Sequence, residues 1–215
     1  PAGAGGGAAS PADADAIPIG TQSVAYGVAS IALGDQATAT WHRNIAIGEN
    51  AFADGYTGTG NIAFGQDAMT APGVGGETSN AIAFGTGAQA TETSAMAMGD
   101  TAVANGAAST AVGSSAQAQA DGSTAVGTGS QATAASATAL GTYAYAAGES
   151  ALASGTNAFA TGMNSIASGY NSYAGADDGM ALGSYAVVES TAGVALGTGA
   201  WVSAANSVAI GANAR

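Results

Sequence analysis

One phrase, an apolar residue, an alanine, a second apolar residue and a closing glycine, recurs along most of this 215-residue chain. Aligned on that closing glycine, here called the repeat glycine, ten successive copies stand 14 residues apart, from Gly85 to Gly211. Four copies precede Gly85, and the intervals that follow Gly48 and Gly65 hold three and six extra residues. An extra copy, SVAYG, ends seven residues after the first repeat glycine and indicates that each repeat has two similar halves. Such a fixed period predicts an array of stacked units, each called a coil below.

The residues before the repeat glycine predict a β-strand. The second residue before it is alanine in every copy except the first, which has Pro18. The residues on either side of this alanine are mostly large and apolar, as in Ile31 and Leu33. An alternation with a period of two is typical of a strand, and the alanine row indicates an interior too narrow for larger side chains.

A second strand is predicted after the repeat glycine. Small residues stand three and five positions after it, as in Ala102 and Ala104, and the residue between them varies. Acidic residues such as Asp35 and Asp121 avoid both strands and fall where Gly, Asn, Asp and Ser favour turns. Two strands and two turns per coil predict an all-β fold, a parallel β-roll (β-solenoid) whose coils pair through backbone hydrogen bonds.

The large apolar residues of the first strand point away from the alanine interior. Over many coils they form an apolar stripe, which on a soluble protein drives association, so we expect another chain to cover it. The residues predicted for this subunit core are Ile31, Leu33, Ile45, Ile47, Ile62, Phe64, Ile82, Phe84, Met96, Met98, Val112, Val126, Leu140, Leu152, Ile166, Met180, Leu182, Val194, Leu196, Val208 and Ile210.

The charge of the chain argues against several classes of partner. Only 7% of its residues are charged, and the net charge is -12 with Arg43 and Arg215 as the only basic side chains besides one histidine. This charge repels phosphate backbones and anionic membranes, so we expect no nucleic-acid partner. The absence of cysteine excludes disulfides and thiolate metal sites. The uncharged stretch 122–148 is too rich in Gly, Ser and Thr for a membrane span, so no membrane insertion is expected.

The repeats set the expected domain organisation. Residues 1–16 lack the basic and hydrophobic regions of a signal peptide, and we expect a flexible Gly/Ala/Pro-rich lead-in there. Residues 17–215 are expected to form the β-roll, with insertions near 54–60 and 71–79.

Three phrases resemble the repeats of a known family: NIAIGENAFA (44–53), STAVGSSAQA (109–118) and NSVAIGANAR (206–215). They are similar to the YadA-like heads of trimeric autotransporter adhesins, and the resemblance extends over residues 17–215. In that family the head is a left-handed parallel β-roll, three chains associate around a three-fold axis, and a coiled-coil stalk carries the head on the outer membrane of Gram-negative bacteria.

The resemblance implies a cell-surface homotrimer that attaches to host extracellular matrix proteins or cell-surface receptors. The chain ends at Arg215 without a recognisable neck, stalk or membrane barrel, so anchoring in the outer membrane is expected of the parent protein only. Polar residues interrupt the apolar stripe and predict a weaker trimer core in their coils. They are Thr110, Thr124, Thr138, Ser154 and Ser168.

Two sets of side chains are candidate ligand contacts. The residue four after the repeat glycine is aromatic in several late coils, at Tyr145, Phe159, Tyr173 and Trp201. We expect these rings to form a column on the outside of the second strand, where they either stack between coils and subunits or contact a ligand. The other set is Trp41 and Arg43 in the sequence TWHRN, because both residue types are enriched at binding hot spots.

No catalytic, metal or cofactor site is predicted. His42 is the only histidine and has no second histidine or cysteine to share a metal, so we expect a surface turn. Asp177 and Asp178 are expected in a solvated turn, because no calcium-binding nonapeptide recurs. The glycine-rich stretches 3–7 and 71–77 lack the lysine of a phosphate-binding loop.

The sequence therefore favours a non-enzymatic adhesin head that binds through many weak contacts. A hexapeptide-repeat acyltransferase is disfavoured by the period of 14, and an ice-binding solenoid by the varied residues of the outward column. A structural spacer that holds another binding domain away from the cell stays open as the alternative.

Overall fold

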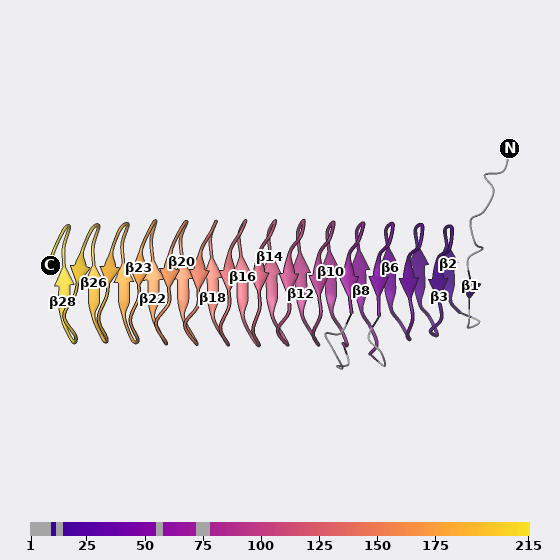
Figure 1. The fold of residues 1–215 in the computed structure, drawn as a ribbon, viewed down its shortest axis with the longest axis horizontal. Helices are drawn as coiled ribbons and strands as arrows, with labels where there is room; N and C mark the ends of the chain where they lie inside the picture. The colour runs from indigo at the N-terminus through magenta and orange to yellow at the C-terminus, as the bar shows by residue number, and fades with distance from the viewer. Residues whose placement is uncertain (1–9, 12–14, 55–57, 72–77) are drawn as a thin grey trace. The chain divides into compact units, whose positions relative to one another are not determined.

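The computed structural model describes residues 10–11, 15–54, 58–71 and 78–215. Most of the expected lead-in and the middle of both expected insertions lie outside these residues. The chain forms two compact units, Pro1–Ala108 (unit 1) and Ser109–Arg215 (unit 2). In both units two-residue strands with odd numbers alternate with three-residue strands with even numbers (Figure 1).

The strands of unit 1 are β1 (Ser10–Pro11), β2 (Ile17–Ile19), β3 (Val24–Ala25), β4 (Ile31–Leu33), β5 (Thr38–Ala39), β6 (Ile45–Ile47), β7 (Phe52–Ala53), β8 (Ile62–Phe64), β9 (Met69–Thr70), β10 (Ile82–Phe84), β11 (Gln89–Ala90), β12 (Met96–Met98) and β13 (Val103–Ala104). Those of unit 2 are β14 (Thr110–Val112), β15 (Gln117–Ala118), β16 (Thr124–Val126), β17 (Gln131–Ala132), β18 (Thr138–Leu140), β19 (Tyr145–Ala146), β20 (Leu152–Ser154), β21 (Phe159–Ala160), β22 (Ile166–Ser168), β23 (Tyr173–Ala174), β24 (Met180–Leu182), β25 (Val187–Val188), β26 (Val194–Leu196), β27 (Trp201–Val202) and β28 (Val208–Ile210).

Strands of the same parity pair in parallel from one coil to the next. Thr124 pairs with Thr138, 14 residues on, and the same step recurs through unit 2. In unit 1 the register holds across the two longer intervals, because Ile45 pairs with Ile62 and Ile62 with Ile82. The structure thus confirms the predicted parallel β-solenoid with 14-residue coils.

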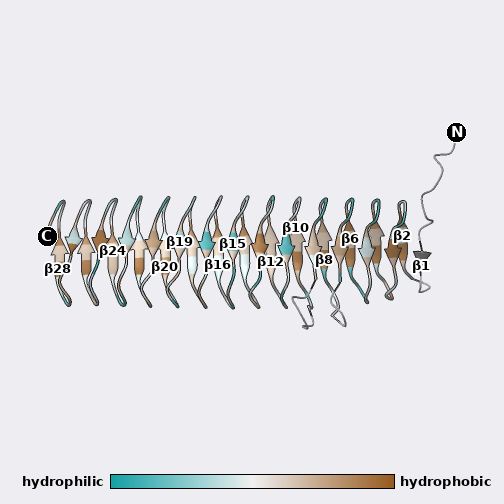
Figure 2. Ribbon diagram, in the orientation of Figure 1, coloured by the Kyte–Doolittle hydropathy of each residue, from teal (hydrophilic) through white to brown (hydrophobic). Residues whose placement is uncertain are grey.

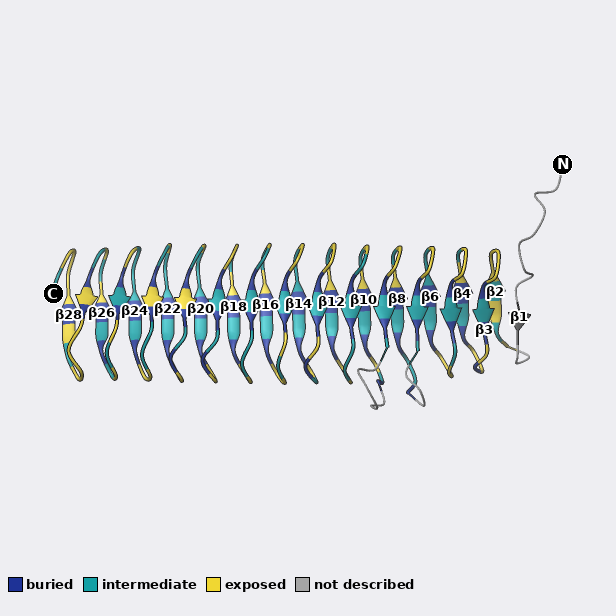
Figure 3. Ribbon diagram, viewed as in Figure 1, coloured by how far each residue is buried: buried dark blue, intermediate teal, exposed yellow. Residues whose placement is uncertain are grey.

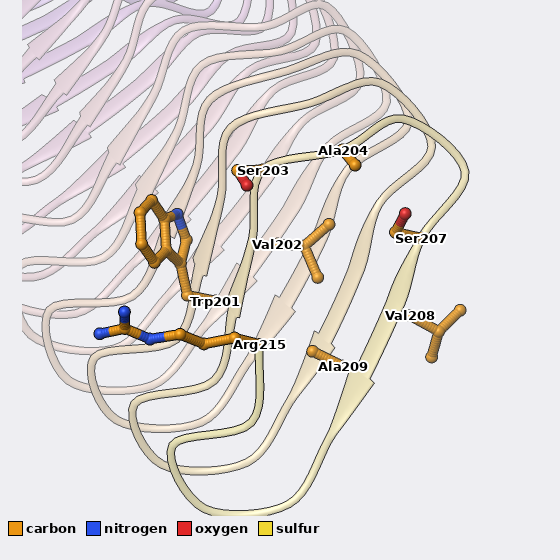
Figure 4. A pocket seen from close by; sticks show the side chains of 8 residues that line it. All are labelled: Trp201, Val202, Ser203, Ala204, Ser207, Val208, Ala209 and Arg215. Atoms are coloured by element: carbon orange, nitrogen blue, oxygen red, sulfur yellow. The ribbon is translucent and has the colours of Figure 1, made fainter.

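Small side chains from both strands of a coil fill the interior. Ala125 of β16 and Ala132 of β17 are fully buried, and the alanines at the same positions of the other coils repeat this pattern. Figure 3 shows buried bands along the strands and exposed residues at the turns. In the last coil Val202 and Ala209 point inward, whereas Trp201 and Val208 point away from the interior (Figure 4). The alternation predicted from the sequence is therefore the one observed.

The repeat glycine has a conformation and a contact that exclude other residues. At Gly127 the φ angle is 134°, and a Cβ atom would lie 2.5 Å from the carbonyl oxygen of Gly141 in the next coil. An L-residue reaches this φ region only with strain, and the neighbouring backbone leaves no room for a side chain. This close approach explains why the glycine recurs in every coil.

The 14-residue coils from Gly85 to Gly197 each have two turns, and both use a left-handed residue. The first turn places it two residues after the repeat glycine, as at Asn157, and the second turn nine residues after it, as at Asn164. The two positions are seven residues apart, in agreement with the two similar halves indicated by the sequence.

Two buried asparagines form hydrogen bonds to the backbone where the intervals of unit 1 are longer. The Asn44 Oδ1 atom accepts a hydrogen bond from the Asn61 backbone N–H (2.9 Å), and the Asn61 Oδ1 atom accepts one from the Ala81 N–H (3.0 Å). The Asn61 Nδ2 atom donates to the Thr78 carbonyl at 2.7 Å. These side chains pair backbone groups that would otherwise be buried without partners, which is costly.

Candidate interaction surfaces

The even-numbered strands of unit 1 expose a row of large apolar side chains. Figure 2 colours the ribbon of these strands largely as hydrophobic. Phe84 is 47% exposed, and Leu33, Phe64 and Met98 stand at the same position of their coils with similar exposure. The rings of Phe64 and Phe84 stack with centroids 4.8 Å apart and planes 6° apart. The residues two positions before them, Ile31, Ile62, Ile82 and Met96, are half-buried on the same face. The outward direction predicted for these residues is thus observed, and the face offers an apolar surface.

The same face of unit 2 is less apolar. Val126, Leu140 and Leu196 are exposed on it. The polar residues that interrupt the stripe are half-buried beside them, at Thr110, Thr124, Thr138, Ser154 and Ser168. Both kinds of side chain point outward, so β14 to β22 present apolar and hydroxyl groups together, whereas β24, β26 and β28 carry apolar residues at both outward positions.

The predicted aromatic column lies on the odd-numbered strands of unit 2. Tyr145 pairs with Phe159 and Phe159 with Tyr173 in the strand register, and Val187 separates Tyr173 from Trp201. Phe159, Tyr173 and Trp201 are exposed, and Tyr145 is half-buried. The structure therefore brings these side chains to one face, in the expected order.

Contacts within the chain hold several of these rings. The rings of Tyr145 and Phe159 are 5.9 Å apart and tilted by 51°. The Trp201 Nε1 atom donates a hydrogen bond to the Glu189 carboxylate at 3.1 Å. The Arg215 guanidinium lies 5.0 Å from the centre of the Trp201 ring, within cation–π distance. The sequence left two interpretations of the aromatic column, stacking between coils and subunits or contact with a ligand. Contacts within the chain thus account for part of these positions.

The TWHRN sequence forms a second turn in unit 1 that exposes Trp41, His42 and Arg43. Arg43 has a φ of 61°, and the His42 Nδ1 atom accepts a hydrogen bond from the Val28 N–H at 3.0 Å. A pocket of about 390 Å³ is lined by Val28, His42, Arg43 and Thr59. Trp41 is exposed in the same turn. Of the two candidate contact residues, Arg43 therefore lines this cavity, and Trp41 stands exposed two residues before it in the same turn.

A second pocket, of about 430 Å³, lies at the last coil (Figure 4). Its walls include Val202 and Ala209, which belong to the rows that fill the interior of the solenoid. Its polar groups are the side chains of Ser203, Ser207 and Arg215. The pocket is therefore continuous with the packed interior.

Three exposed tyrosines of unit 2 were not among the residues predicted from the sequence. They are Tyr143, Tyr170 and Tyr185, and all three lie in first turns. Tyr143 and Tyr185 occupy the left-handed position, where the other coils of unit 2 place Asn, Ser or Gly. A bulky residue at a turn position that favours Asn or Gly was the signal available in the sequence.

Among the described residues, no three His, Cys, Asp or Glu side chains are grouped as a metal site requires. The described part of the chain also holds no helix that is long and apolar enough to cross a membrane.

A sequence profile of the YadA head domain repeat matches the chain in overlapping segments that together cover more than half of it. The segments are 15–40, 79–102, 90–116, 104–130, 118–144, 132–158, 142–165, 160–186 and 189–214. A comparison with curated proteins gave no significant match. Among solved structures, the crystal structure of the collagen-binding domain of the Yersinia adhesin YadA is similar, with 27% sequence identity and a TM-score of 0.48 over 70% of this chain and 80% of that chain. On the strength of the repeat profile, which matches more than half of its residues, this chain belongs to the YadA head domain family.

Proposed function

We propose that the chain is the head of a bacterial surface adhesin, a non-enzymatic homotrimer of left-handed β-rolls that attaches to host extracellular matrix or cell-surface receptors. Membership in the YadA head family supports the adhesin class. The observation that supports the trimer is the apolar face of the even-numbered strands. Its large side chains are exposed in a single chain, Phe84 to 47%.

Association through this face has a clear physical reason. Full burial of one large apolar side chain stabilises by about 1.5 to 3 kcal/mol. The row repeats in successive coils, so covering it adds this contribution many times and offsets the entropy that association costs. The proposed subunit contacts in unit 1 are the outward residues of β4, β6, β8, β10 and β12, and in unit 2 those of the even-numbered strands from β14 to β28.

Attachment then follows from repetition. Each outward residue makes a weak contact, and three chains with many coils multiply these contacts on one rigid scaffold. The proposed ligand contacts are the aromatic column at Tyr145, Phe159, Tyr173 and Trp201, and the turn with Trp41 and Arg43. The parent protein is anchored in the outer membrane of a Gram-negative bacterium and exposes the head at the cell surface.

The oligomeric state tests the first half of the proposal. Sedimentation equilibrium at micromolar concentration should give about three times the 20.0 kDa mass of one chain. Phe84→Asp should dissociate the assembly, because it would bury an unpaired carboxylate once per chain at the interface. Gln89→Asp is the matched control, since Gln89 lies on the odd-numbered face of the same coil. A monomeric wild type, or a Phe84→Asp variant that assembles normally, contradicts the interface.

Solid-phase binding tests the second half. The intact trimer should bind at least one of immobilised collagens, fibronectin, laminin or host glycans. The alternative is a spacer, and it is favoured by one observation: part of the aromatic column is engaged within the chain, as in the Trp201–Glu189 hydrogen bond. If the trimer binds nothing while the full-length parent protein binds, the spacer function replaces the adhesive one.

A further inference from the structure

The first turns of unit 2 form one continuous edge, called here the first-turn edge. It consists of the two residues that follow each repeat glycine from Gly113 to Gly211. The backbone N–H of the second residue donates to the carbonyl of the first residue one coil earlier, as from Tyr143 to Thr128 (2.9 Å) and from Tyr185 to Tyr170 (2.9 Å). Because these bonds fix each turn against the next, side chains on this edge stand in a row at the spacing of the coils.

The first-turn edge carries no charge. Its residues are Ser, Thr, Asn, Gly, Ala and Tyr only. Four of the six first turns of unit 1 carry an acidic residue, Asp35, Glu49, Asp67 or Asp100. In unit 2 the carboxylates of Asp121, Glu149 and Asp177 stand instead in the second turns. Charge is therefore absent from the one edge of unit 2 that holds the exposed tyrosines.

The tyrosines on this edge are not explained by folding. Tyr143 and Tyr185 have φ angles of 55° and 58°, in the left-handed region that disfavours bulky residues. Burial does not compensate for this strain, because the two residues are 58% and 53% exposed. Asn157, Asn171 and Asn213 fill the same position in neighbouring coils, and asparagine tolerates the left-handed conformation better. A strained and exposed aromatic residue points to a role outside the fold.

The rings are arranged along the edge. The ring of Tyr143 lies over Gly129 of the preceding coil, where any side chain would collide with it. Tyr170 and Tyr185 meet edge to face, with centroids 5.4 Å apart and planes at 84°. Tyr143 and Tyr170 stand two coils apart, which at about 4.8 Å per coil is about 10 Å. Hydroxyl and amide side chains such as Thr156 and Asn157 lie between them.

We propose that the first-turn edge of unit 2 binds an uncharged saccharide chain, laid along the row of turns with sugar rings against the tyrosines. This assignment rests on the adhesin function proposed above and names the ligand class of one of its surfaces. The C–H groups on one side of a sugar ring carry a slight positive charge and suit the negative face of an aromatic ring. The Ser, Thr and Asn side chains between the tyrosines supply donors and acceptors for sugar hydroxyls.

The charge and the shape of the edge favour this ligand over others. Sulfated or sialylated glycans are anionic, and a chain with a net charge of -12 and no basic residue on this edge repels them. A stable protein interface needs about 800 Å² on each side, whereas this ridge is two residues wide at each turn. A linear polymer matches a ridge whose contact groups repeat along one direction.

The repeat itself supplies the test variant. Tyr143→Asn, Tyr185→Asn and Tyr170→Thr together give the edge the residues that stand in neighbouring coils. Saturation-transfer NMR and calorimetric titration would measure binding of chitohexaose, cellohexaose and maltohexaose to the intact wild-type protein and to this variant. We expect at least one oligosaccharide to bind the wild type and to lose at least tenfold in affinity with the variant, while the melting temperature is unchanged or higher.

Tyr26→Thr is the matched control, because it removes an exposed tyrosine that lies outside the first-turn edge and introduces the residue found at the same position of the next coil, Thr40. This variant should bind the oligosaccharide as the wild type does. A wild type that binds none of the three, a triple variant with unchanged affinity, or an equal loss in Tyr26→Thr overturns the proposal. If the triple variant loses binding to immobilised collagen or fibronectin instead, the edge is a protein-binding surface and the adhesin function stands without the saccharide.

Discussion

At the scale of single residues, the glycines with a positive φ angle are of two kinds. Gly127 has a φ of 134° and lies against the backbone of the next coil. Gly122 has a φ of 64°, and a Cβ atom there would meet only the Ser136 Oγ atom, at 3.7 Å. Ala192 already occupies the corresponding turn position of another coil with a φ of 54°. Only a glycine of the first kind, such as Gly127, is required both by the close approach of the neighbouring backbone and by its φ angle.

We therefore expect very different costs from the same substitution. Gly127→Ala should lower the free energy of unfolding by at least about 4 kcal/mol or prevent folding, because strain and overlap with backbone act together. Gly122→Ala should cost about 1 kcal/mol, the usual cost of the left-handed conformation for alanine. Chemical denaturation of both variants measures the difference, and equal losses would show that the repeat glycine is not fixed by its neighbour.

At the scale of the strands and coils, the two rows that face each other across the interior adjust to one another in size. Val188 and Val202 are the large inward residues of the odd-numbered strands of unit 2, where other coils have alanine. A Cβ atom on Gly193 would lie 2.9 Å from the Val188 Cγ1 atom and 2.8 Å from the Val202 Cγ1 atom. Most other coils carry Ser or Ala at the position of Gly193. A larger side chain in one row is thus matched by a smaller one in the other.

This complementarity predicts a coupling between the rows. In the wild-type chain, Gly193→Ala should lower the free energy of unfolding by about 1 to 3 kcal/mol because it overpacks the interior. The same substitution should cost far less in the Val188→Ala/Val202→Ala background, which gives a coupling of about 0.5 to 3 kcal/mol in a double-mutant cycle. Ser165→Ala, in the same column two coils earlier, adds no atom and is the control for the site. Additive losses would place the two valines outside contact with Gly193.

The repeat made much of this architecture predictable. Because alanine stands at every second position, only one side of each strand can face the interior. Both strands, both turns and the outward column could therefore be predicted from the positions of residues such as Ala125 and Tyr173. The matched pair of Val188 and Gly193 could not be predicted, because the facing rows meet through space and not through sequence spacing. The exposed tyrosines of the first turns were not predicted for a related reason. A turn residue gives no periodic signal in the sequence, and only the φ angle of Tyr143 shows that its backbone is strained.

At the scale of the whole molecule, the outward face of the even-numbered strands differs between the two units. Unit 1 presents large apolar side chains there, such as Phe64 and Phe84, whereas unit 2 places Thr110, Thr124 and Thr138 in three successive coils. If neighbouring chains cover this face, hydroxyl groups are buried where a methyl group would pack better. The proposed trimer is then held less tightly by these coils than by those of unit 1.

Replacement of the three threonines by valine tests this view. Val is close to Thr in shape and also favours strands, so Thr110→Val, Thr124→Val and Thr138→Val should leave each chain folded in the same way. In a trimer each substitution should raise the free energy of unfolding by about 1 kcal/mol. Each kcal/mol corresponds to a rise of about 2 to 4 °C in the melting temperature. The gain should depend on protein concentration, because assembly and folding are linked by mass action. Valine at these sites of an uncovered face would give no concentration-dependent gain and would increase aggregation, a result that would place the subunit contact elsewhere on the coil.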